Sequence, residues 1–154
     1  HQCNEYSLNN IINFIKYLDK SWQILIFGAL GNEEQKIIKL CNNKINRHVI
    51  SSDYNLEQQM AIMSNLDVMI SMDSANGHIA SLFGIDVITI WGATHPNSGY
   101  GPLNQPKENS IVPDLNKYPD LPVTIYGSDC PADYVEAINS IKCERILERL
   151  DKII

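Results

Sequence analysis

A length of 154 residues is enough for one compact domain and too short for two complete α/β domains. Hydrophobic residues make up 44% of the chain and charged residues 19%, which argues against a disordered or fibrous protein. The formal net charge of −6 disfavours general binding to nucleic acid or to an anionic membrane, so any phosphate group must be bound locally.

Alternating helix and strand patterns follow from Tyr6 onward. In chain order they predict a helix over 6–20, a strand over 22–27, a helix through 37–40, a strand near 48–51, a helix over 56–65, a strand over 67–72, a helix over 77–83 and a strand over 85–91. Ser7 is a plausible cap for the first helix. The alternation predicts an α/β fold with a doubly wound, mainly parallel sheet.

The last third of the chain has a different composition. Residues 92–122 hold six of the seven prolines, which predicts a long irregular segment of the kind that often carries function. Residues 131–150 have an amphipathic pattern that predicts one C-terminal helix. Its apolar positions are Val135, Ile138, Ile141, Ile146, Leu147 and Leu150.

Neither a membrane span nor a disulfide framework is predicted. The longest apolar runs, 24–30 and 87–93, are far below the roughly 18 residues that span a bilayer, and no signal peptide opens the sequence, so we expect a cytoplasmic protein. The chain begins with His1 rather than methionine, from which we expect further sequence ahead of it. The cysteines form no CxxC pair, which favours reduced structural thiols and no metal site. They are Cys3, Cys41, Cys130 and Cys143.

The junction after the predicted strand 67–72 is where the sequence indicates chemistry. Asp73 follows the strand at the edge where ligands collect in open α/β sheets, and it could bond sugar hydroxyls. The first turn of the next helix has unpaired N–H groups and a positive dipole end, which favour an anion such as a pyrophosphate. The candidate donors are the amides of Ala75, Asn76, Gly77 and His78.

Two side-chain features add to this junction, and each has a plainer interpretation. Gly77 leaves room for a ligand to approach the backbone, and His78 can point back and donate to phosphate. Alternatively, Asp73 or Ser74 is a simple helix cap and His78 is an ordinary surface histidine. No Walker, GxGxxG or GxSxG pattern is present to decide between them.

Two neighbouring segments resemble a known family. Residues 67–84 read Asp-Val-Met-Ile-Ser-Met-Asp-Ser-Ala-Asn-Gly-His-Ile-Ala-Ser-Leu-Phe-Gly, and residues 87–96 read Val-Ile-Thr-Ile-Trp-Gly-Ala-Thr-His-Pro. Together they resemble the signature of glycosyltransferase family nine, the ADP-heptose:lipopolysaccharide heptosyltransferases. The resemblance implies a GT-B enzyme, built from two Rossmann-like domains with the active site between them. This chain resembles the second, donor-binding domain, with the N-terminal acceptor domain and its catalytic base absent.

The resemblance also implies roles for particular residues. Asp73 would hold the heptose, and the turn from Ser74 to His78 would hold the diphosphate. Glu33 would contact the ribose, and Tyr54 would lie on the adenine side, although it could equally be a loop tyrosine that packs on the sheet edge. The basic residue that the family places ahead of the first helix has no match here. No cofactor and no metal is implied, because the ADP-sugar is a substrate.

The function implied is the donor-binding half of an inverting enzyme. It would move heptose from ADP-heptose, or a related nucleotide sugar, to a lipopolysaccharide core acceptor held by the missing domain. The full-length enzyme would lie peripherally at the inner face of the inner membrane. The alternative is a stand-alone flavodoxin-like module for nucleotide binding or protein interaction. Of the other candidates, His95 could act in catalysis but more often such a residue shapes a loop, and Cys130 is expected to be structural.

Overall fold

The structure of the protein, a computed structural model, describes residues 2–28, 47–50, 54–125 and 130–154. The expected helix through 37–40 and the candidate Glu33 lie outside these residues. Within them, no helix has the length and apolar character needed to cross a membrane.

The described elements alternate as an α/β fold. The helices and strands are α1 (Leu8–Tyr17), β1 (Ile24–Phe27), β2 (Arg47–Ile50), α3 (Leu56–Met63), β3 (Val68–Met72), α4 (Ala75–Leu82), β4 (Asp86–Ile90), β5 (Ser110–Ile111) and α5 (Cys143–Leu150). Short 3₁₀ turns are η1 (Gln2–Asn4), η2 (Pro96–Ser98), η3 (Lys107–Asn109), η4 (Ala132–Tyr134) and η5 (Ile138–Ser140). All described strand pairs are parallel, which confirms the predicted fold class.

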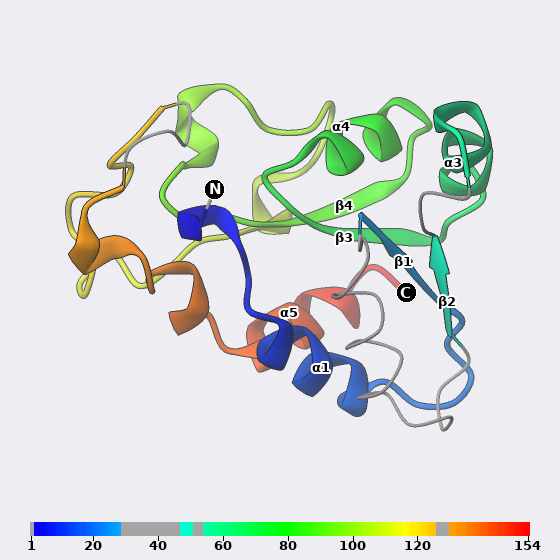
Figure 1. Ribbon diagram of the computed structural model, residues 1–154, viewed down its shortest axis with the longest axis horizontal. Coiled ribbons are helices and arrows are strands. Elements are labelled where there is room, and N and C mark those ends of the chain that lie inside the picture. The colour runs from blue at the N-terminus through cyan, green and yellow to red at the C-terminus, as the bar shows by residue number, and fades with distance from the viewer. Residues whose placement is uncertain (1, 29–46, 51–53, 126–129) are drawn as a thin grey trace.

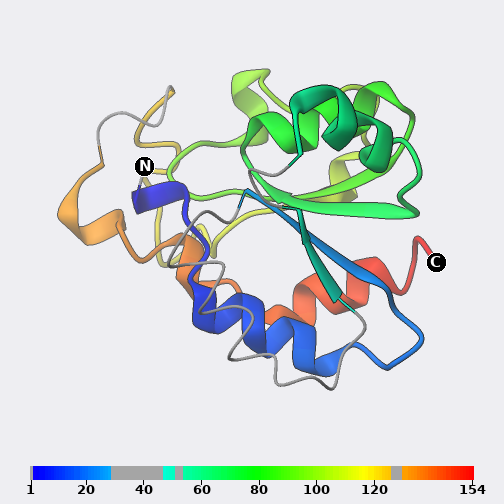
Figure 2. The ribbon, with the colours of Figure 1, turned by 45° about the vertical axis from the view of Figure 1, so that its right-hand side comes forward.

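Helices cover the strands from both sides. Figures 1 and 2 show α3 and α4 on one side and α1 and α5 on the other. Val87 of β4 packs with Met69 and Ala80 on the α4 side, whereas Ile88 and Ile90 belong to the large core cluster with α1 and α5. β4 is thus buried on both faces, as central parallel strands are.

The strands form two sheets over one core. β1 pairs with β2, while β3, β4 and β5 form a three-stranded sheet in that order. Ile24 and Ile26 of β1 pack against the same cluster as Val68 and Ile70 of β3. The two sheets are therefore joined through apolar contacts.

Local capping accounts for two helix starts. Ser7 Oγ accepts a hydrogen bond from the Asn10 amide, which confirms the predicted cap of α1. Asn55 and Gln58 form a capping box at the start of α3.

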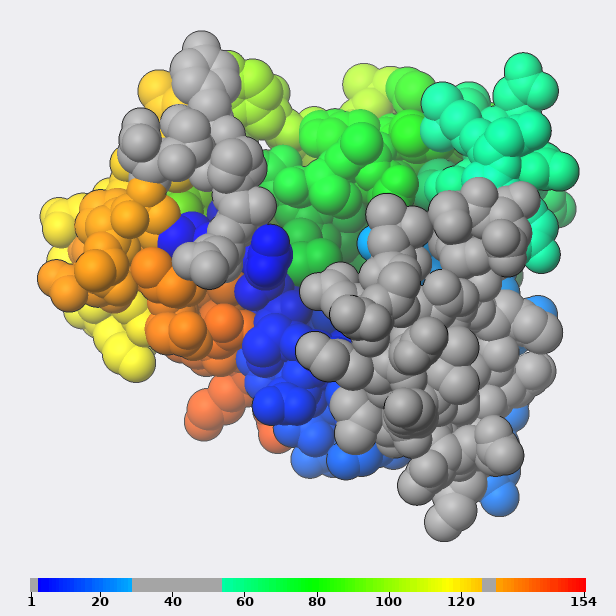
Figure 3. All heavy atoms as spheres, in the orientation of Figure 1, coloured from blue at the N-terminus to red at the C-terminus, as the bar shows by residue number. Residues whose placement is uncertain are grey.

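The prediction of one helix over residues 131–150 is wrong. The segment contains η4, η5 and then α5, with the backbone extended at Ile141 and Lys142. The Ile141 carbonyl accepts the Tyr6 hydroxyl at 2.8 Å, and Asn139 Oδ1 accepts the Ser7 amide at 2.8 Å. These contacts with the start of α1 replace helical hydrogen bonds, and Figure 3 shows the blue N-terminal residues beside this orange segment. The predicted burial pattern holds in part, because Ile138, Ile141, Ile146 and Leu150 are buried while Val135 and Leu147 are half-buried.

The segment 92–122 is mostly irregular, as predicted, but it contains a strand that the sequence did not indicate. β5 pairs with the end of β4 through Thr89 with Ser110 and Ile90 with Ile111. The Trp91 amide also donates to the Ile111 carbonyl at 2.9 Å. The Leu121–Pro122 peptide bond is cis.

The expectation of reduced thiols is wrong for one pair of cysteines. Cys3 and Cys130 form a disulfide, with their Cα atoms 6.3 Å apart and a sequence separation of 127. Spacing rules do not detect a pair that is brought together only by folding. Cys143 is a free thiol, Cys41 lies outside the described residues, and the cytoplasmic location stays a prediction.

Candidate functional site

Asp73 is the first residue after β3, and the loop after β4 holds its carboxylate. Thr94 Oγ1 donates to Asp73 Oδ2 at 2.8 Å. Thr94 is 4% exposed, whereas the Asp73 side chain is 19% exposed. Because β3 and β4 are parallel neighbours, their carboxyl ends meet at one edge, where ligands of open α/β sheets bind. The sequence indicated Asp73 but not this partner.

Helix α4 begins at Ala75, two residues earlier than predicted. Ser74 has the backbone position of an N-cap, but its side chain makes no capping hydrogen bond and lies 2.9 Å from Ser71 Oγ. The Asp73 carboxylate is bonded to Thr94 instead. The interpretation of Asp73 or Ser74 as a simple cap is therefore wrong, because both side chains bond elsewhere.

The first turn of α4 offers backbone donors. In a helix that begins at Ala75, the amide of His78 is the first to bond within the helix, which leaves those before it without an intrahelical partner. Among the described residues, no acceptor outside the helix is found for the amides of Ala75, Asn76 and Gly77. Ala75 is exposed and Asn76 is half-buried. These two amides are the most open to a ligand.

His78 lies one turn into α4, on the side of Asp73. Its Nε2 is 3.9 Å from Asp73 Oδ1, too far for a hydrogen bond but close enough for an ion pair if the ring is protonated. The His78 side chain is 44% exposed. The structure thus brings these two predicted residues together and leaves the imidazole accessible.

The glycine in this turn has a packing role. A Cβ on Gly77 would lie 3.0 Å from Ser71 Oγ and 3.4 Å from Val87 Cγ1. Gly77 is buried between α4 and the sheet, so its missing side chain serves close packing and does not make room for a ligand. Its amide as a phosphate donor stays a prediction.

The end of β1 approaches the same turn. Gly28 has a φ of 82°, and a Cβ on it would lie 3.8 Å from Asn76 Nδ2. The carboxyl ends of β1, β3 and β4 therefore converge on the start of α4. This convergence gives one site with backbone donors, a carboxylate and an imidazole, which can bind a phosphate group beside a hydroxyl-rich group.

The N-terminal segment closes one side of this edge, a contact that sequence reasoning missed. The Ala93 amide donates to Asn4 Oδ1 at 2.9 Å and to the Cys3 carbonyl at 3.3 Å. A Cβ on Gly92 would lie 2.7 Å from Asn4 Oδ1 and would collide with the Cys3 carbonyl. The glycine after Trp91 is the signal that could have indicated a close approach of another backbone.

His95 shapes the loop that follows Thr94. Its Nδ1 accepts the Asn97 amide at 3.2 Å, so His95 caps η2. Burial lowers the pKa of His95 below its usual value, which favours the neutral ring with its proton on Nε2. These contacts support the loop-shaping interpretation.

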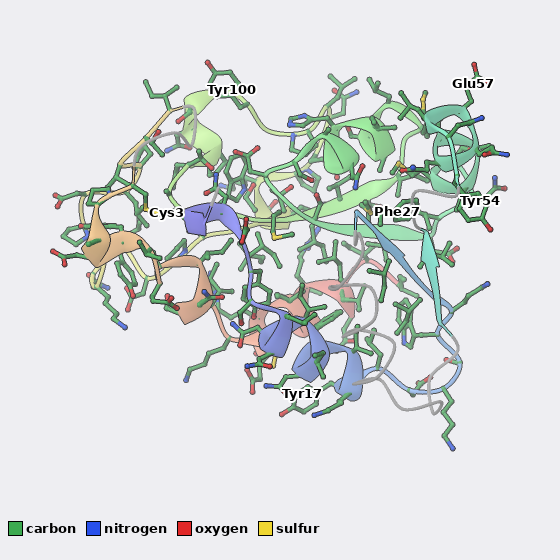
Figure 4. All side chains as sticks on the ribbon, viewed as in Figure 1. Cys3, Tyr17, Phe27, Tyr54, Glu57 and Tyr100 are labelled. Carbon is green, nitrogen blue, oxygen red and sulfur yellow. A yellow bond between two sulfur atoms is a disulfide. The ribbon has the colours of Figure 1, made fainter. Side chains whose placement is uncertain are left out.

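Tyr54 lies just before α3. Figure 4 shows Tyr54 at the start of α3, at the opposite end of the view from Cys3. It is 40% exposed, and no hydrogen bond or ion pair within the described residues joins it to Asp73. Its place on the adenine side stays a prediction.

One cavity in the described part of the chain lies apart from most of these residues. Its volume is about 1010 Å³, and it lies between β1 and β3 and the helices α1 and α5. Its lining is mainly apolar, and only Ser74 and Asn76 of the candidate site reach it. A charged diphosphate would lose its hydration there without gaining partners, so we place the site at the strand ends. Within the described residues, no cluster of His, Cys, Asp and Glu could hold a metal ion.

Comparisons with known proteins bear on the fold and the family of the chain. No curated protein matches the chain. A family 9 glycosyl transferase of known crystal structure, from Veillonella parvula DSM 2008, has a similar fold at 15% sequence identity with a TM-score of 0.69. The match covers 97% of this chain and 42% of that one, so the chain spans less than half of that protein's length. The family model of glycosyltransferase family 9 (heptosyltransferase) matches residues 14–125, and the chain therefore belongs to that family.

Proposed function

We propose that this chain is the donor-binding part of an inverting glycosyltransferase that moves heptose from ADP-heptose to a lipopolysaccharide core acceptor. The observation that carries the proposal is the position of Asp73, whose carboxylate stands at the end of β3 beside the open first turn of α4. A carboxylate next to backbone donors suits a ligand that joins a polyol to a diphosphate.

Each group in the site has a proposed task. The amides of the first turn of α4 bind the diphosphate, assisted by His78, and Asp73 accepts hydrogen bonds from the sugar hydroxyls. Glu33 on the ribose and Tyr54 near the adenine remain proposals that rest on family resemblance alone. The ADP-sugar is consumed, so it is a substrate and not a cofactor.

Binding of ADP to this chain tests the proposal. With only part of the active-site cleft present, we expect binding in the high micromolar to millimolar range, about −4 to −5.5 kcal/mol. In an NMR titration, ADP should shift the amides from Ser74 to His78, and adenosine, which lacks the diphosphate, should shift them much less. If ADP leaves these amides unmoved, the site is assigned wrongly.

The same proposal implies that this chain alone transfers no sugar. Inverting transfer needs a base that takes the proton of the acceptor hydroxyl as its oxygen attacks the anomeric carbon. Asp73 is occupied by the sugar in this scheme, so the base belongs to the N-terminal acceptor domain.

An assay of transfer checks this point. The chain is incubated with ADP-heptose and a heptose-less lipopolysaccharide core, and transferred sugar is sought by mass spectrometry. We expect none, and recovery of transfer when the acceptor domain is added. Turnover by the chain alone, at a rate near that of an intact relative, would refute the assignment of the catalytic base to the acceptor domain.

A further inference from the structure

We propose that Thr94 is a positioning residue that orients the Asp73 carboxylate toward the donor sugar, and so sets the preference of the site for a nucleotide sugar over the free nucleotide. This inference rests on the proposed function, because it assumes that Asp73 holds the sugar and assigns to Thr94 the orientation of that carboxylate.

The hydroxyl of Thr94 is fixed in place by its surroundings. Thr94 is 4% exposed, and its β-branched side chain has few available rotamers. The backbone just before it is bonded on both sides, because the Ala93 amide donates to Asn4 Oδ1 and the Ala93 carbonyl accepts the Val123 amide at 3.1 Å. Thr94 Oγ1 is therefore a donor with a defined position.

This donor engages only one oxygen of the carboxylate. Thr94 Oγ1 bonds to Asp73 Oδ2, while His78 Nε2 lies 3.9 Å from Oδ1. Within the described residues, no hydrogen bond to Oδ1 is found. Because rotation about the carboxyl torsion of aspartate is otherwise broad, the bond to Oδ2 selects one orientation and leaves Oδ1 free to accept.

The effect should fall on the sugar and not on the diphosphate. The proposed diphosphate donors are backbone amides of α4, and within the described residues none of them is hydrogen-bonded to Thr94. Removing the Thr94 hydroxyl leaves the charge of Asp73 unchanged but releases its orientation. A threonine with a purely structural role would instead weaken both ligands by the same factor, or neither.

The experiment measures the dissociation constants of ADP and ADP-heptose for this chain and compares their ratio between variants. Thr94→Val keeps the shape of the side chain and removes the hydroxyl. This variant should show a preference for ADP-heptose over ADP that is reduced about five- to tenfold, with little change in the dissociation constant of ADP. Thr94→Ser, which keeps the donor, should retain most of the preference. Thr89→Val is the matched control, because Thr89 is buried in β4 and lies outside the site, and it should leave the ratio unchanged.

A double variant tests whether the two residues act as one unit. If Thr94 acts only through Asp73, then Thr94→Val should cost no further preference once Asp73→Asn is present. Thr94→Ala removes the same hydroxyl and replaces Thr94→Val if that variant does not fold.

The outcomes separate the inference from the function on which it rests. An unchanged ratio in the Thr94 variants, or equal weakening of both ligands, would overturn the role of Thr94 while ADP binding still stood. The same conclusion would follow if the unaltered chain bound ADP and ADP-heptose equally well. If the unaltered chain bound neither ligand, the proposed function would fail first, and the inference with it.

Discussion

Asp73 has neighbours from two structural elements, although its own position is set by one strand. The in-register pairing of β3 with β4 brings Thr94 to Oδ2, and the helical turn after Ser74 brings His78 to within 3.9 Å of Oδ1. The first contact is a part-buried hydrogen bond with a buried donor, whereas the second involves a 44% exposed imidazole, so the two should differ in their contribution to stability.

Substitution of these residues should separate stability from binding. Asp73→Ala leaves the buried Thr94 hydroxyl without its acceptor, and we expect the free energy of unfolding to fall by about 1–3 kcal/mol. His78→Ala should change it by less than about 0.5 kcal/mol, because the ring is accessible and forms no hydrogen bond in the described structure. Urea unfolding of both variants measures this. A larger loss for His78→Ala would contradict these assignments.

His95 should make stability depend on pH. Burial lowers its folded pKa below the ordinary value of 6.5, so the unfolded chain binds more protons in the range just below 6.5. Lowering the pH through this range should therefore reduce the free energy of unfolding. Protonation of His95 also removes the acceptor that Nδ1 provides for the Asn97 amide.

The variant His95→Asn keeps an acceptor side chain without this titration. From about pH 7.5 to about pH 5.5, the unaltered protein should lose more stability than the variant, as measured by urea unfolding at each pH. Parallel pH profiles for the two proteins would show that His95 does not contribute.

At the level of elements, α4 is fixed by how closely it approaches the sheet. Gly77 faces Ser71 of β3 and Val87 of β4, and this contact sets the distance between the first turn of α4 and the strand ends. A long-range contact also fixes the position of the residues just before α1, because the Tyr6 hydroxyl donates to the Ile141 carbonyl. Burial raises the pKa of Tyr6 to about 12, so this donor stays protonated at neutral pH.

Gly77→Ala tests the packing of α4. Alanine favours a helix over glycine by about 0.5–1 kcal/mol, but the added Cβ overpacks against Ser71 at a cost of about 1–3 kcal/mol. We expect a net loss of roughly 1–2 kcal/mol on thermal or urea unfolding.

Gly101→Ala is the control, since a Cβ there meets no atom within 4 Å, and it should change stability by less than about 0.5 kcal/mol. In a Ser71→Ala background, where the nearest atom is gone, Gly77→Ala should cost less. A Gly77→Ala protein as stable as the unaltered one would remove the packing explanation.

At the scale of the whole molecule, a disulfide joins the N-terminal segment to a distant part of the chain beside the candidate site. The disulfide between Cys3 and Cys130 connects η1 to the residues just before η4, and η1 itself packs on Gly92 and Ala93. The N-terminal segment is thus held against the loop that carries Thr94.

Reduction of this disulfide should destabilise the fold. Opening a covalent loop this long returns conformational freedom to the unfolded chain, and we expect a loss of about 2–4 kcal/mol in the free energy of unfolding. Urea unfolding with and without a reducing agent measures the loss. A Cys3→Ser variant should show the reduced stability under both conditions, and an effect of reductant that persists in that variant would assign it to another thiol.

The sequence by itself predicted the α/β class, a strand over 67–72, observed as Val68–Met72, and a helix after Asp73, because these depend on residues near one another in the chain. The family signature lies in the same continuous stretch, and so Asp73 and His78 could be named in advance. Folding decided the rest. Three features depend on contacts between residues far apart in sequence. They are the Asp73–Thr94 hydrogen bond, the Cys3–Cys130 disulfide, and the bond from Tyr6 to Ile141 where the predicted helix is interrupted. β5 is two residues long, too short to have a detectable period, and it exists because β4 offers its backbone as a partner. Periodicity reports which face of an element is buried, whereas the partner on that face depends on which strands become neighbours, and only the tertiary structure determines that.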